Sequence, residues 1–291
     1  MNEFDFITQI RALARRDVRV PVGIGDDAAV LRFSKDRELL FTTDMLIEGR
    51  HFKLKEASAF EIGRKAMAVN LSDIAAMGGV PTLAVVAVGL PKKCMGRFAK
   101  ELYRGLRSLE KKFHVAVVGG DTNASEKVIV SVALLGQVEK GRALLRSGAR
   151  VGDALCVSGT LGGSYVSKKH LNFTPRVKEA RYLAKNFKVH ALMDISDGLA
   201  SDARRICEQS GVGALLDERS IPVARAAKNV AQALNDGEDF ELLFTLSQKE
   251  ASRLPRFYRV LGRVMPKKHG LKLLKKNGVV VSLRGGFDHF K

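Results

Sequence analysis

The sequence has no tryptophan and only three cysteines, and these two shortages set the first limits on the protein. Without tryptophan, a hydrophobic core has to be built from aliphatic side chains and from the 15 phenylalanines. Cys94, Cys156 and Cys207 lie far apart, and no Cys-x-x-Cys pair occurs. The sequence therefore indicates neither a disulfide framework nor a zinc site, and it fits a reducing compartment in which the cysteines are buried.

Long hydrophobic runs are also missing. The longest apolar stretch, 83–90, is far shorter than the roughly 20 residues that a helix needs to span a bilayer. Residues 1–5 carry early acidic side chains and no apolar segment, which is not the pattern of a signal peptide. We therefore expect a cytoplasmic protein that has no membrane partner.

Several common nucleotide-binding and hydrolytic motifs are absent as well. Gly162-Gly163 lacks the Lys-Ser/Thr that would complete a phosphate-binding Walker A loop. The protein-kinase motifs, the three-glycine dinucleotide motif, the His-Glu-x-x-His zinc motif and the nucleophile elbow do not occur. If the chain binds a nucleotide, another kind of site has to hold the phosphates.

The length and composition allow a sizeable folded protein. A chain of 291 residues, of which 46% are apolar, can form one large domain or two ordinary ones. Patterns typical of strands and helices alternate in both halves, which favours α/β or α+β domains. We place the boundary in the polar, basic connector 141–152, so that the domains are 1–141 and 142–291.

Hydrophobic periodicity predicts the individual elements. In the first half we expect helices over 3–16, 58–77 and 95–112, and strands over 28–33, 38–43, 82–90, 115–118 and 128–138. In the second half we expect helices over 162–170, 175–187 and 198–210, and strands over 154–157, 213–217, 240–246, 258–264 and 278–282. These bounds place Asp44 at the end of a strand, where loops often hold ligands.

The charge balance is strongly basic, with a formal net charge of +18. Such a balance fits either a nucleic-acid-binding surface or a solvated surface that also attracts anionic metabolites. The densest basic run, 267–276, has no interleaved aromatic residues and no nucleic-acid motif. The solvated surface is therefore the favoured interpretation.

Six short acidic motifs stand out against this basic background. They are Gly25-Asp26-Asp27, Thr42-Thr43-Asp44, Asn70-Leu71-Ser72-Asp73, Gly119-Gly120-Asp121-Thr122, Asp194-Ile195-Ser196-Asp197-Gly198 and Gly237-Glu238-Asp239. Each places a carboxylate beside glycine, a hydroxyl residue or both. Proteins usually hold Mg²⁺ with a few carboxylates together with substrate phosphates. The motifs therefore indicate a cluster of divalent metals that carries a nucleotide.

Asp73 gives the strongest single argument for a metal. The helix over 58–77 is apolar nearly all round and should be buried, yet it places Asn70 and Asp73 on one face. An unpaired buried carboxylate is costly, so Asp73 needs a metal, an arginine or several donors. An internal salt bridge remains the alternative.

The other acidic motifs also have purely structural alternatives. They are an aspartate turn at 25–27, a cap or turn at 42–44, a strand-to-turn transition at 119–122 and an N-cap at Asp197. The paired glycines at 119–120 also let backbone N–H groups approach an anion. Each motif is weak alone, and their co-occurrence is what favours a metal site.

The order and spacing of these motifs resemble those of the thiamine-monophosphate kinase family. The resemblance covers nearly the whole chain, and the segments that carry it are 23–30 (GIGDDAAV), 42–52 (TTDMLIEGRHF), 65–79 (KAMAVNLSDIAAMGG), 119–122 (GGDT), 146–153 (RSGARVGD), 194–202 (DISDGLASD), 237–244 (GEDFELLF) and 286–290 (GFDHF). The wider superfamily includes aminoimidazole ribonucleotide synthetase and selenophosphate synthetase. It implies a two-domain aminoimidazole ribonucleotide synthetase-like fold and a homodimer formed through N-terminal strands near 28–43, 82–90 and 128–138.

The resemblance also implies a reaction, the ATP-dependent phosphorylation of thiamine monophosphate to thiamine diphosphate with several Mg²⁺ ions. The nucleophile would be a phosphate monoester whose second pKa is about 6. It is largely dianionic at neutral pH, so no general base is needed. Phosphoryl transfer depends mainly on positioning and electrostatic stabilisation. We therefore expect direct in-line transfer without a phosphoenzyme.

The resemblance assigns roles to individual residues. The implied metal ligands are Asp27, Thr42, Thr43, Asp44, Asp73, Asp121, Asp194 and Asp197. The implied ATP contacts are Gly120, Asp121, Arg146 and Ser196, and we take Asp44, Asp121 and Arg146 as catalytic. The implied thiamine contacts are His51, Glu238 and Phe287. The structural alternatives are a satisfied histidine for His51, core packing for Phe287 and a solvated linker charge for Arg146.

Three departures from the family pattern bear on the substrate loop. Asp236 stands where a second glycine is usual, Phe240 replaces a common tyrosine, and the region between Gly163 and Asp194 is short. Two other functions remain as alternatives, another enzyme of the superfamily and a nucleic-acid-binding protein with degenerate motifs. The first cysteine is Cys94, which argues against selenophosphate synthesis, and the intact acidic set argues against degeneration.

Overall fold

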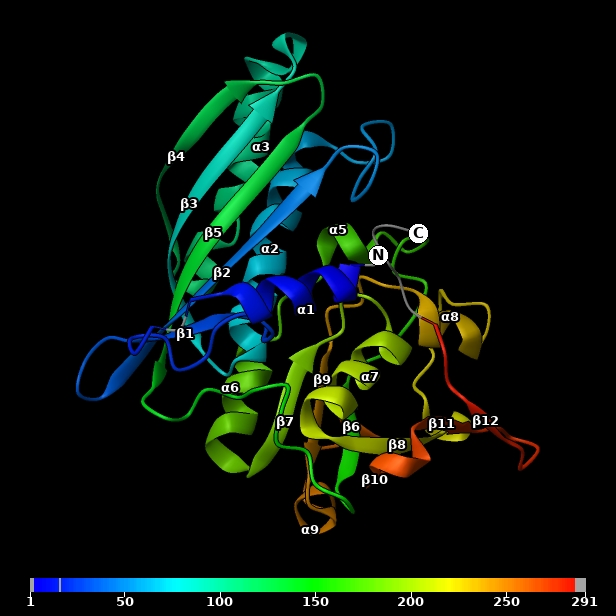
Figure 1. Cartoon of the computed structure of the whole chain (residues 1–291). Helices are drawn as coiled ribbons and strands as arrows, with labels where there is room; N and C mark the ends of the chain where they lie inside the picture. The colour runs from blue at the N-terminus through cyan, green and yellow to red at the C-terminus, as the bar shows by residue number, and fades with distance from the viewer. Residues whose placement is uncertain (1–2, 16, 286–291) are drawn as a thin grey trace.

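The chain folds into two β-sheets with helices packed against them (Figure 1), and the computed structural model describes residues 3–15 and 17–285. The first half contains α1 (Glu3–Leu13), β1 (Ala29–Arg32), β2 (Arg37–Ile47), α2 (Ala59–Ala76), β3 (Val80–Leu90), η1 (Lys92–Cys94), α3 (Arg97–Arg107), α4 (Glu110–Phe113), β4 (Ala116–Ala124) and β5 (Ile129–Glu139). The second half contains β6 (Ala154–Ser158), α5 (Lys169–Asn172), α6 (Val177–Asn186), β7 (Val189–Asp194), α7 (Leu199–Ser210), β8 (Val212–Asp217), η2 (Glu218–Ser220), α8 (Val230–Asn235), β9 (Leu242–Leu246), α9 (Gln248–Ala251), β10 (Tyr258–Pro266), η3 (Lys267–His269), β11 (Leu271–Leu274) and β12 (Val280–Ser282). This mixed architecture confirms the predicted α/β class.

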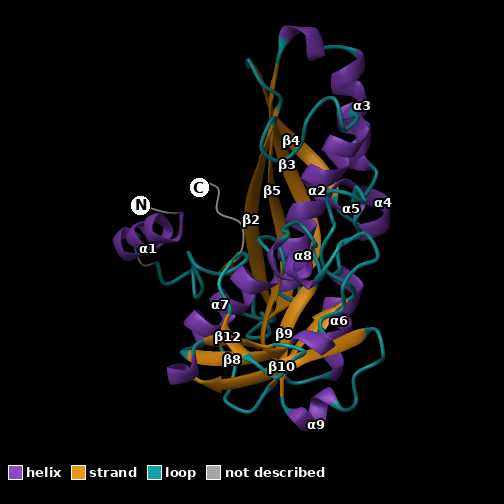
Figure 2. Ribbon diagram, turned by 90° about the vertical axis from the view of Figure 1, so that its right-hand side faces the viewer, coloured by secondary structure: helices purple, strands orange, loops and turns teal. Residues whose placement is uncertain are grey.

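The N-terminal sheet has the strand order β1-β2-β5-β3-β4, and among the described residues helices pack against one of its faces (Figure 2). Burial alternates along β5, as expected for a strand with one face in the core. Figure 2 shows α2 and α3 on the covered side. The opposite face exposes large apolar side chains, namely Phe41, Met45, Leu83, Val85 and Val118.

Helix α2 is buried between this sheet and the second half of the chain. It begins with a capping box, in which Ser58 and Glu61 satisfy each other's backbone N–H groups. Two glycines let α2 and α3 approach closely. A Cβ at Gly63 would lie 1.9 Å from the carbonyl oxygen of Leu102, and a Cβ at Gly105 would lie 1.9 Å from that of Phe60. Glycine is therefore required at this crossing.

The C-terminal sheet has the strand order β12-β11-β8-β10-β6-β9-β7. Its strands β6 and β9, which lie next to each other near the β7 edge, are buried along their whole length and pair in antiparallel fashion. Leu192 on β7 and Phe244 on β9 share one hydrophobic core with Met67 of α2. The two halves are thus packed together through α2, which brings the ends of β7 and of α2 close to each other.

Several sequence predictions are confirmed and others are wrong. The three cysteines are buried and free, as expected. Asp44 does not lie at a strand end, because β2 continues to Ile47, which pairs with Ile129. The strand predicted at 115–118 does not stop before Gly119, because β4 continues to Ala124 in parallel pairing with β3.

The helix predicted over 162–170 is also wrong, since only Lys169–Asn172 is helical there. Gly162 and Gly163 have φ angles of +86° and +69°, which are incompatible with a right-handed helix. The sequence analysis did not identify β7, β11, α8 or α9. Within the described part of the chain, no helix is long and apolar enough to cross a membrane.

Candidate functional site

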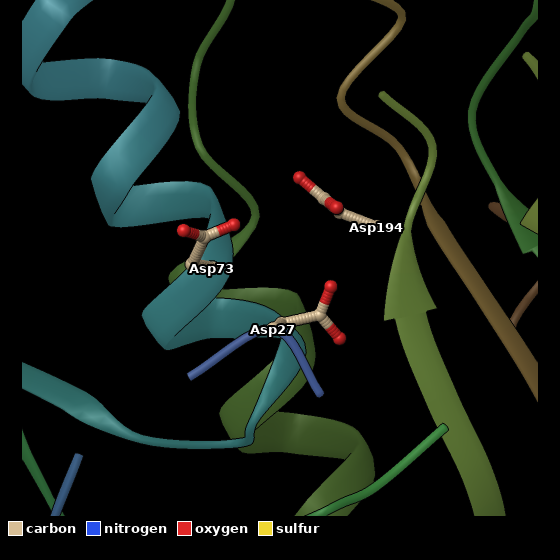
Figure 3. Close-up of side chains that lie close together, drawn as sticks. All are labelled: Asp27, Asp73 and Asp194. Atoms are coloured by element: carbon tan, nitrogen blue, oxygen red, sulfur yellow. The ribbon is translucent and has the colours of Figure 1, made fainter. Parts of the chain in front are cut away.

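Three carboxylates that are far apart in the sequence converge between the two halves of the chain. Asp27 precedes β1, Asp73 lies in the last turns of α2, and Asp194 ends β7. One oxygen from each lies within 4.8 Å of the others, and Figure 3 shows the three side chains turned toward one another. Like charges at this separation repel, so the arrangement needs either protons or a cation.

Hydroxyl and amide groups orient these carboxylates. Thr42 Oγ1 donates to Asp73 Oδ2 at 2.5 Å, and Ser72 Oγ donates to Asp194 Oδ2 at 2.5 Å. Asn70 accepts a hydrogen bond from the backbone N–H of Asp44 at 3.1 Å. Residues 70, 72 and 73 all belong to α2, so this helix fixes β2 and the end of β7 around the cluster.

Arg146 supplies positive charge at one side of the cluster. Its Nη2 lies 2.6 Å from Asp27 Oδ1, and its backbone N–H donates to Asp26 Oδ1 at 2.9 Å. Burial alone would lower the pKa of Arg146, but the charge of Asp27 and its hydrogen bonds raise it. Arg146 is therefore not a solvated linker charge, and that alternative from the sequence is wrong.

The pKa values of Asp73 and Asp194 are raised, because burial and the neighbouring carboxylates disfavour their charged forms. Burial, and then the charges of Asp44, Asp194 and Asp27, raise the pKa of Asp73 well above its usual value. Burial and the charge of Asp27 raise the pKa of Asp194 to about 7. In a site of this kind a bound cation can replace the protons that the crowded carboxylates would otherwise retain.

Asp27 provides an independent sign that the cluster suits a cation. Its Oδ2 atom is buried, and nothing in the described part of the chain forms a hydrogen bond with it. A buried carboxylate oxygen without a partner is costly. Hard oxygen donors of this number and type are the ligands that Mg²⁺ prefers, so the residues present fit that ion.

The structure does not bring all eight predicted metal ligands together. Thr42, Asp44 and Asp73 lie on the covered side of the N-terminal sheet with Asp27 and Asp194 nearby. Asp121 belongs to another row of residues, in which Asp121 pairs with Ala87, Ala87 with Ser131, and Ser131 with Met45. Side chains in one such row share a face of the sheet, so Asp121 shares the uncovered face with exposed Met45.

Strand order separates Asp121 from the cluster in distance as well. The strands β2 and β4 are three steps apart in the sheet, which corresponds to about 14 Å. Asp121 is exposed and accepts a hydrogen bond from Asn123 at 2.6 Å. Gly120 lies in the same row as Asp44, and Thr43 points to the uncovered face because it alternates with buried Thr42.

Asp197 and Ser196 lie on the turn after β7. Asp197 forms an ion pair with Arg205 at 2.5 Å and is not one of the three converging carboxylates. It is not the N-cap of α7 either, since Gly198 occupies that position. The carbonyl oxygen of Ser196 accepts a hydrogen bond from the N–H of Glu238 at 2.6 Å, which joins this turn to the turn that carries Glu238.

His51 and Glu238, two of the predicted thiamine contacts, are linked by a residue that the sequence analysis did not single out. Lys65 of α2 is fully buried, and its Nζ contacts both carboxylate oxygens of Glu238, at 2.6 and 2.8 Å. It also donates to the carbonyl oxygen of His51 at 2.8 Å. A lysine within a helix that is apolar nearly all round was the available signal. Phe287 lies outside the described residues.

The residues that depart from the family pattern have clear places in the fold. Asp236 accepts a hydrogen bond from the N–H of Gly163 at 3.0 Å. Phe240 is buried and stacks on Phe173, with the ring centroids 4.1 Å apart. Both contacts stabilise the turn that carries Glu238, so the departures do not disrupt this part of the site.

Comparison with protein families matches two models to this chain. The model of the AIR synthase related protein N-terminal domain matches residues 25–138. The model of the corresponding C-terminal domain matches residues 150–254. Six of the eight predicted metal ligands, among them Asp27, Asp44, Asp73 and Asp121, fall in the first matched region. The other two, Asp194 and Asp197, fall in the second.

Individual relatives are similar over most of their length. The thiamine-monophosphate kinase of Rhodopirellula baltica is 40% identical, over 86% of this chain and 84% of the relative. That of Bacillus subtilis is 35% identical over 100% of both chains. The solved structure of AaThiL complexed with AMPPCP and TMP is 32% identical and has a TM-score of 0.87, covering 99% of this chain and 97% of the other.

Proposed function

The chain belongs to the thiamine-monophosphate kinase family, within the AIR synthase related proteins, and we propose that it uses ATP to phosphorylate thiamine monophosphate to thiamine diphosphate. The single observation that carries this proposal is the convergence of Asp27, Asp73 and Asp194 between the two matched regions. A relative with the same fold binds AMPPCP and TMP. We keep the domain boundary at 141/142, in the connector between the matched regions.

Mg²⁺ is the metal that the donor set supports best. Asp27, Asp73 and Asp194 would hold it, with Asp44 and Thr42 beside them. Once bound, such ions neutralise phosphate oxygens and stabilise the charge that develops during phosphoryl transfer. Asp197 is paired with Arg205, and we keep it as a further candidate ligand on the turn that follows Asp194.

The chain's own residues then have mainly positioning roles. Arg146 is buried against Asp27 and carries its positive charge into the site where a polyphosphate would bind. Gly120 and Ser196 remain candidate ATP contacts. On the acceptor side, Glu238 can accept hydrogen bonds from the aminopyrimidine, while His51 and Phe287 remain candidates for contacts with the thiamine rings. The acceptor phosphate is already a dianion at neutral pH, so direct in-line transfer needs no general base.

We also propose that the chain acts as a homodimer, joined through the uncovered face of the N-terminal sheet. This face exposes Phe41, Met45, Leu83 and Val85, and a continuous apolar surface of this kind is typical of an interface. The position of Asp121 supports the same arrangement. It lies on that face, where it could reach a second chain rather than the cluster of its own chain.

The proposed compartment is the cytoplasm. Three free, buried cysteines fit a reducing environment. ATP and Mg²⁺, the cosubstrate and the metal that the site calls for, are both abundant there.

The decisive experiment is incubation of the purified protein with Mg²⁺, ATP and thiamine monophosphate, followed by detection of thiamine diphosphate. We expect product that disappears in excess chelator and in Asp73→Asn. The matched control is Asp36→Asn, which changes an exposed carboxylate far from α2 and should keep full activity. Product formation that is unchanged in excess chelator would refute the metal-dependent mechanism.

A further inference from the structure

Lys65 connects the substrate side of the site to the helix that carries the carboxylate cluster. Its side chain is fully buried, so it cannot touch a substrate in the described structure. Its three N–H donors have three acceptors, namely the two carboxylate oxygens of Glu238 and the carbonyl oxygen of His51. A buried ammonium group is tolerated only when it is paired and hydrogen-bonded in this way.

Glu238 has a backbone conformation that is unfavourable for a residue other than glycine. Its φ angle is +62°, in the left-handed region that disfavours residues other than glycine. Its side chain retains 29% exposure although both carboxylate oxygens contact Lys65, so Glu238 stays within reach of a ligand. The N–H of Glu238 is also fixed by the carbonyl oxygen of Ser196.

Helix α2 also sets the distance between the Lys65–Glu238 contact and the carboxylate cluster. Lys65 and Asp73 are eight residues apart on α2, which corresponds to about 12 Å along the helix axis. The helix is capped at its start and buried along its length, so this spacing is rigid. Without Lys65, described contacts between α2 and the Glu238 carboxylate would be lost.

We propose that Lys65 is a positioning residue that makes Glu238 a selective acceptor for the thiamine half of the substrate. This inference rests on the proposed function and goes beyond it by naming the group that orients the acceptor. Lys65 fixes the orientation of the Glu238 carboxylate by contacting both of its oxygens. The pair is neutral overall, so this part of the site selects a ring by its hydrogen-bond donors rather than by its positive charge.

A merely structural role for Lys65 would give a different pattern of kinetic effects. Loss of a structural contact would lower stability and affect both substrates alike. Loss of a positioning contact should affect thiamine monophosphate and leave ATP nearly unchanged, because ATP binding depends on the carboxylate cluster at the other end of α2. The neighbouring Arg64 provides a matched control. It donates to the carbonyl oxygens of Leu171 and Phe173, at 3.1 and 2.6 Å, and thus also joins α2 to the second half of the chain.

The test compares Lys65→Met with Arg64→Met in steady-state kinetics and in calorimetric binding of thiamine without ATP. For Lys65→Met we expect the KM for thiamine monophosphate and the Kd for thiamine to rise roughly tenfold or more, with the KM for ATP changed less than about twofold. Arg64→Met should lower thermal stability without raising the KM for thiamine monophosphate relative to the KM for ATP. An analogue whose pyrimidine amino group is replaced by oxygen should be rejected by the wild type and discriminated less by Lys65→Met.

A second variant covers the case in which Lys65→Met does not fold. Glu238→Gln retains an acceptor for Lys65 at a partly exposed position, and it should show the same KM split and the same loss of discrimination. If both variants keep the wild-type KM for thiamine monophosphate, the inference is wrong although the proposed function stands. If the wild-type protein neither forms thiamine diphosphate nor binds thiamine, the proposed function fails and the inference fails with it.

Discussion

Arg146 Nη2 lies 2.6 Å from Asp27 Oδ1, in a contact where the Asp27 side chain is fully buried and that of Arg146 is 17% exposed. This contact joins the connector between the two matched regions to the carboxylate cluster. It means that the basic residue expected to face the polyphosphate is already paired with a carboxylate that we expect to bind metal. A bound metal would therefore stabilise the same buried charge as the arginine.

We predict that Arg146→Ala destabilises the metal-free protein more than the Mg²⁺-bound protein. Removing one partner of a buried ion pair costs roughly 3–5 kcal/mol, because the other charge stays buried and unpaired. Mg²⁺ would compensate part of this loss at Asp27. Urea unfolding with EDTA and with Mg²⁺ measures the difference, and exposed Arg142→Ala in the same connector is the control. Equal losses under both conditions would contradict the prediction.

Asp239 should make stability depend on pH. Burial is the main cause that raises its pKa from 3.8 to about 6, although the charge of Lys169 and a hydrogen bond from Gly162 act in the opposite direction. The folded state therefore holds the proton more tightly than the unfolded state. This contribution is fully present below the unfolded pKa, and it is lost as pH rises through about 6, by up to about 3 kcal/mol.

Asp239→Asn should remove this dependence while keeping an oxygen that accepts from the N–H of Gly162. The free energy of unfolding of the variant, measured from pH 4.5 to 7, should therefore fall less steeply than that of the wild type. Asp36→Asn, at an exposed position, should leave the slope unchanged. Parallel curves for wild type and Asp239→Asn would show that Asp239 titrates normally.

Gly63→Ala should destabilise the protein although alanine favours helices. Helix propensity alone would stabilise the variant by about 1 kcal/mol. The added Cβ would lie 1.9 Å from the carbonyl oxygen of Leu102, so α2 and α3 would have to move apart. We expect a net loss of roughly 2 kcal/mol or more in urea unfolding. Gly23→Ala, whose Cβ would have its nearest neighbour at 3.9 Å, is the control, and a stabilised Gly63→Ala would disprove the close crossing.

Val85→Asp should separate the proposed dimer. Val85 is 46% exposed and lies on the uncovered face in β3, an interior strand of the sheet. A charge there would be buried without a partner in an interface. Light scattering should give a mass of two chains for the wild type and of one chain for the variant. Val151→Asp, at a site that is 58% exposed, should stay dimeric, whereas a monomeric wild type at micromolar concentration would refute the proposal.

Local sequence patterns were sufficient to predict α2 and the need of Asp73 for a partner. The capping box and the apolar run predict the helix, and the cost of a buried carboxylate predicts that Asp73 needs a partner. The ends of β2 and β4 could not be predicted from local patterns. Pairing with β5 extends β2 past Asp44, and pairing with β3 carries β4 through Gly119 and Gly120 despite the low strand propensity of glycine.

The partners within the site depend on contacts across the whole chain. Lys65 and Glu238 are 173 residues apart, and Ser72 and Asp194 are 122 residues apart. Periodicity records Lys65 only as a charge within an apolar helix. Its role follows from the packing of α2 against both halves, which no local pattern describes. The same limit applies to Asp121, whose motif indicates a ligand but not the face of the sheet that presents it.

The placement of Asp44 and Asp121 on opposite faces of one sheet makes a genetic test possible. If Asp121 serves the site of the second subunit, Asp44→Ala and Asp121→Ala chains are each inactive alone but complement one another. A mixed dimer would contain one site with both defects and one site with neither. Random mixing of equal amounts should then restore about a quarter of the wild-type turnover, because half of the dimers are mixed and each has one intact site. Cells that express both defective chains would make thiamine diphosphate, while cells that express either one would not.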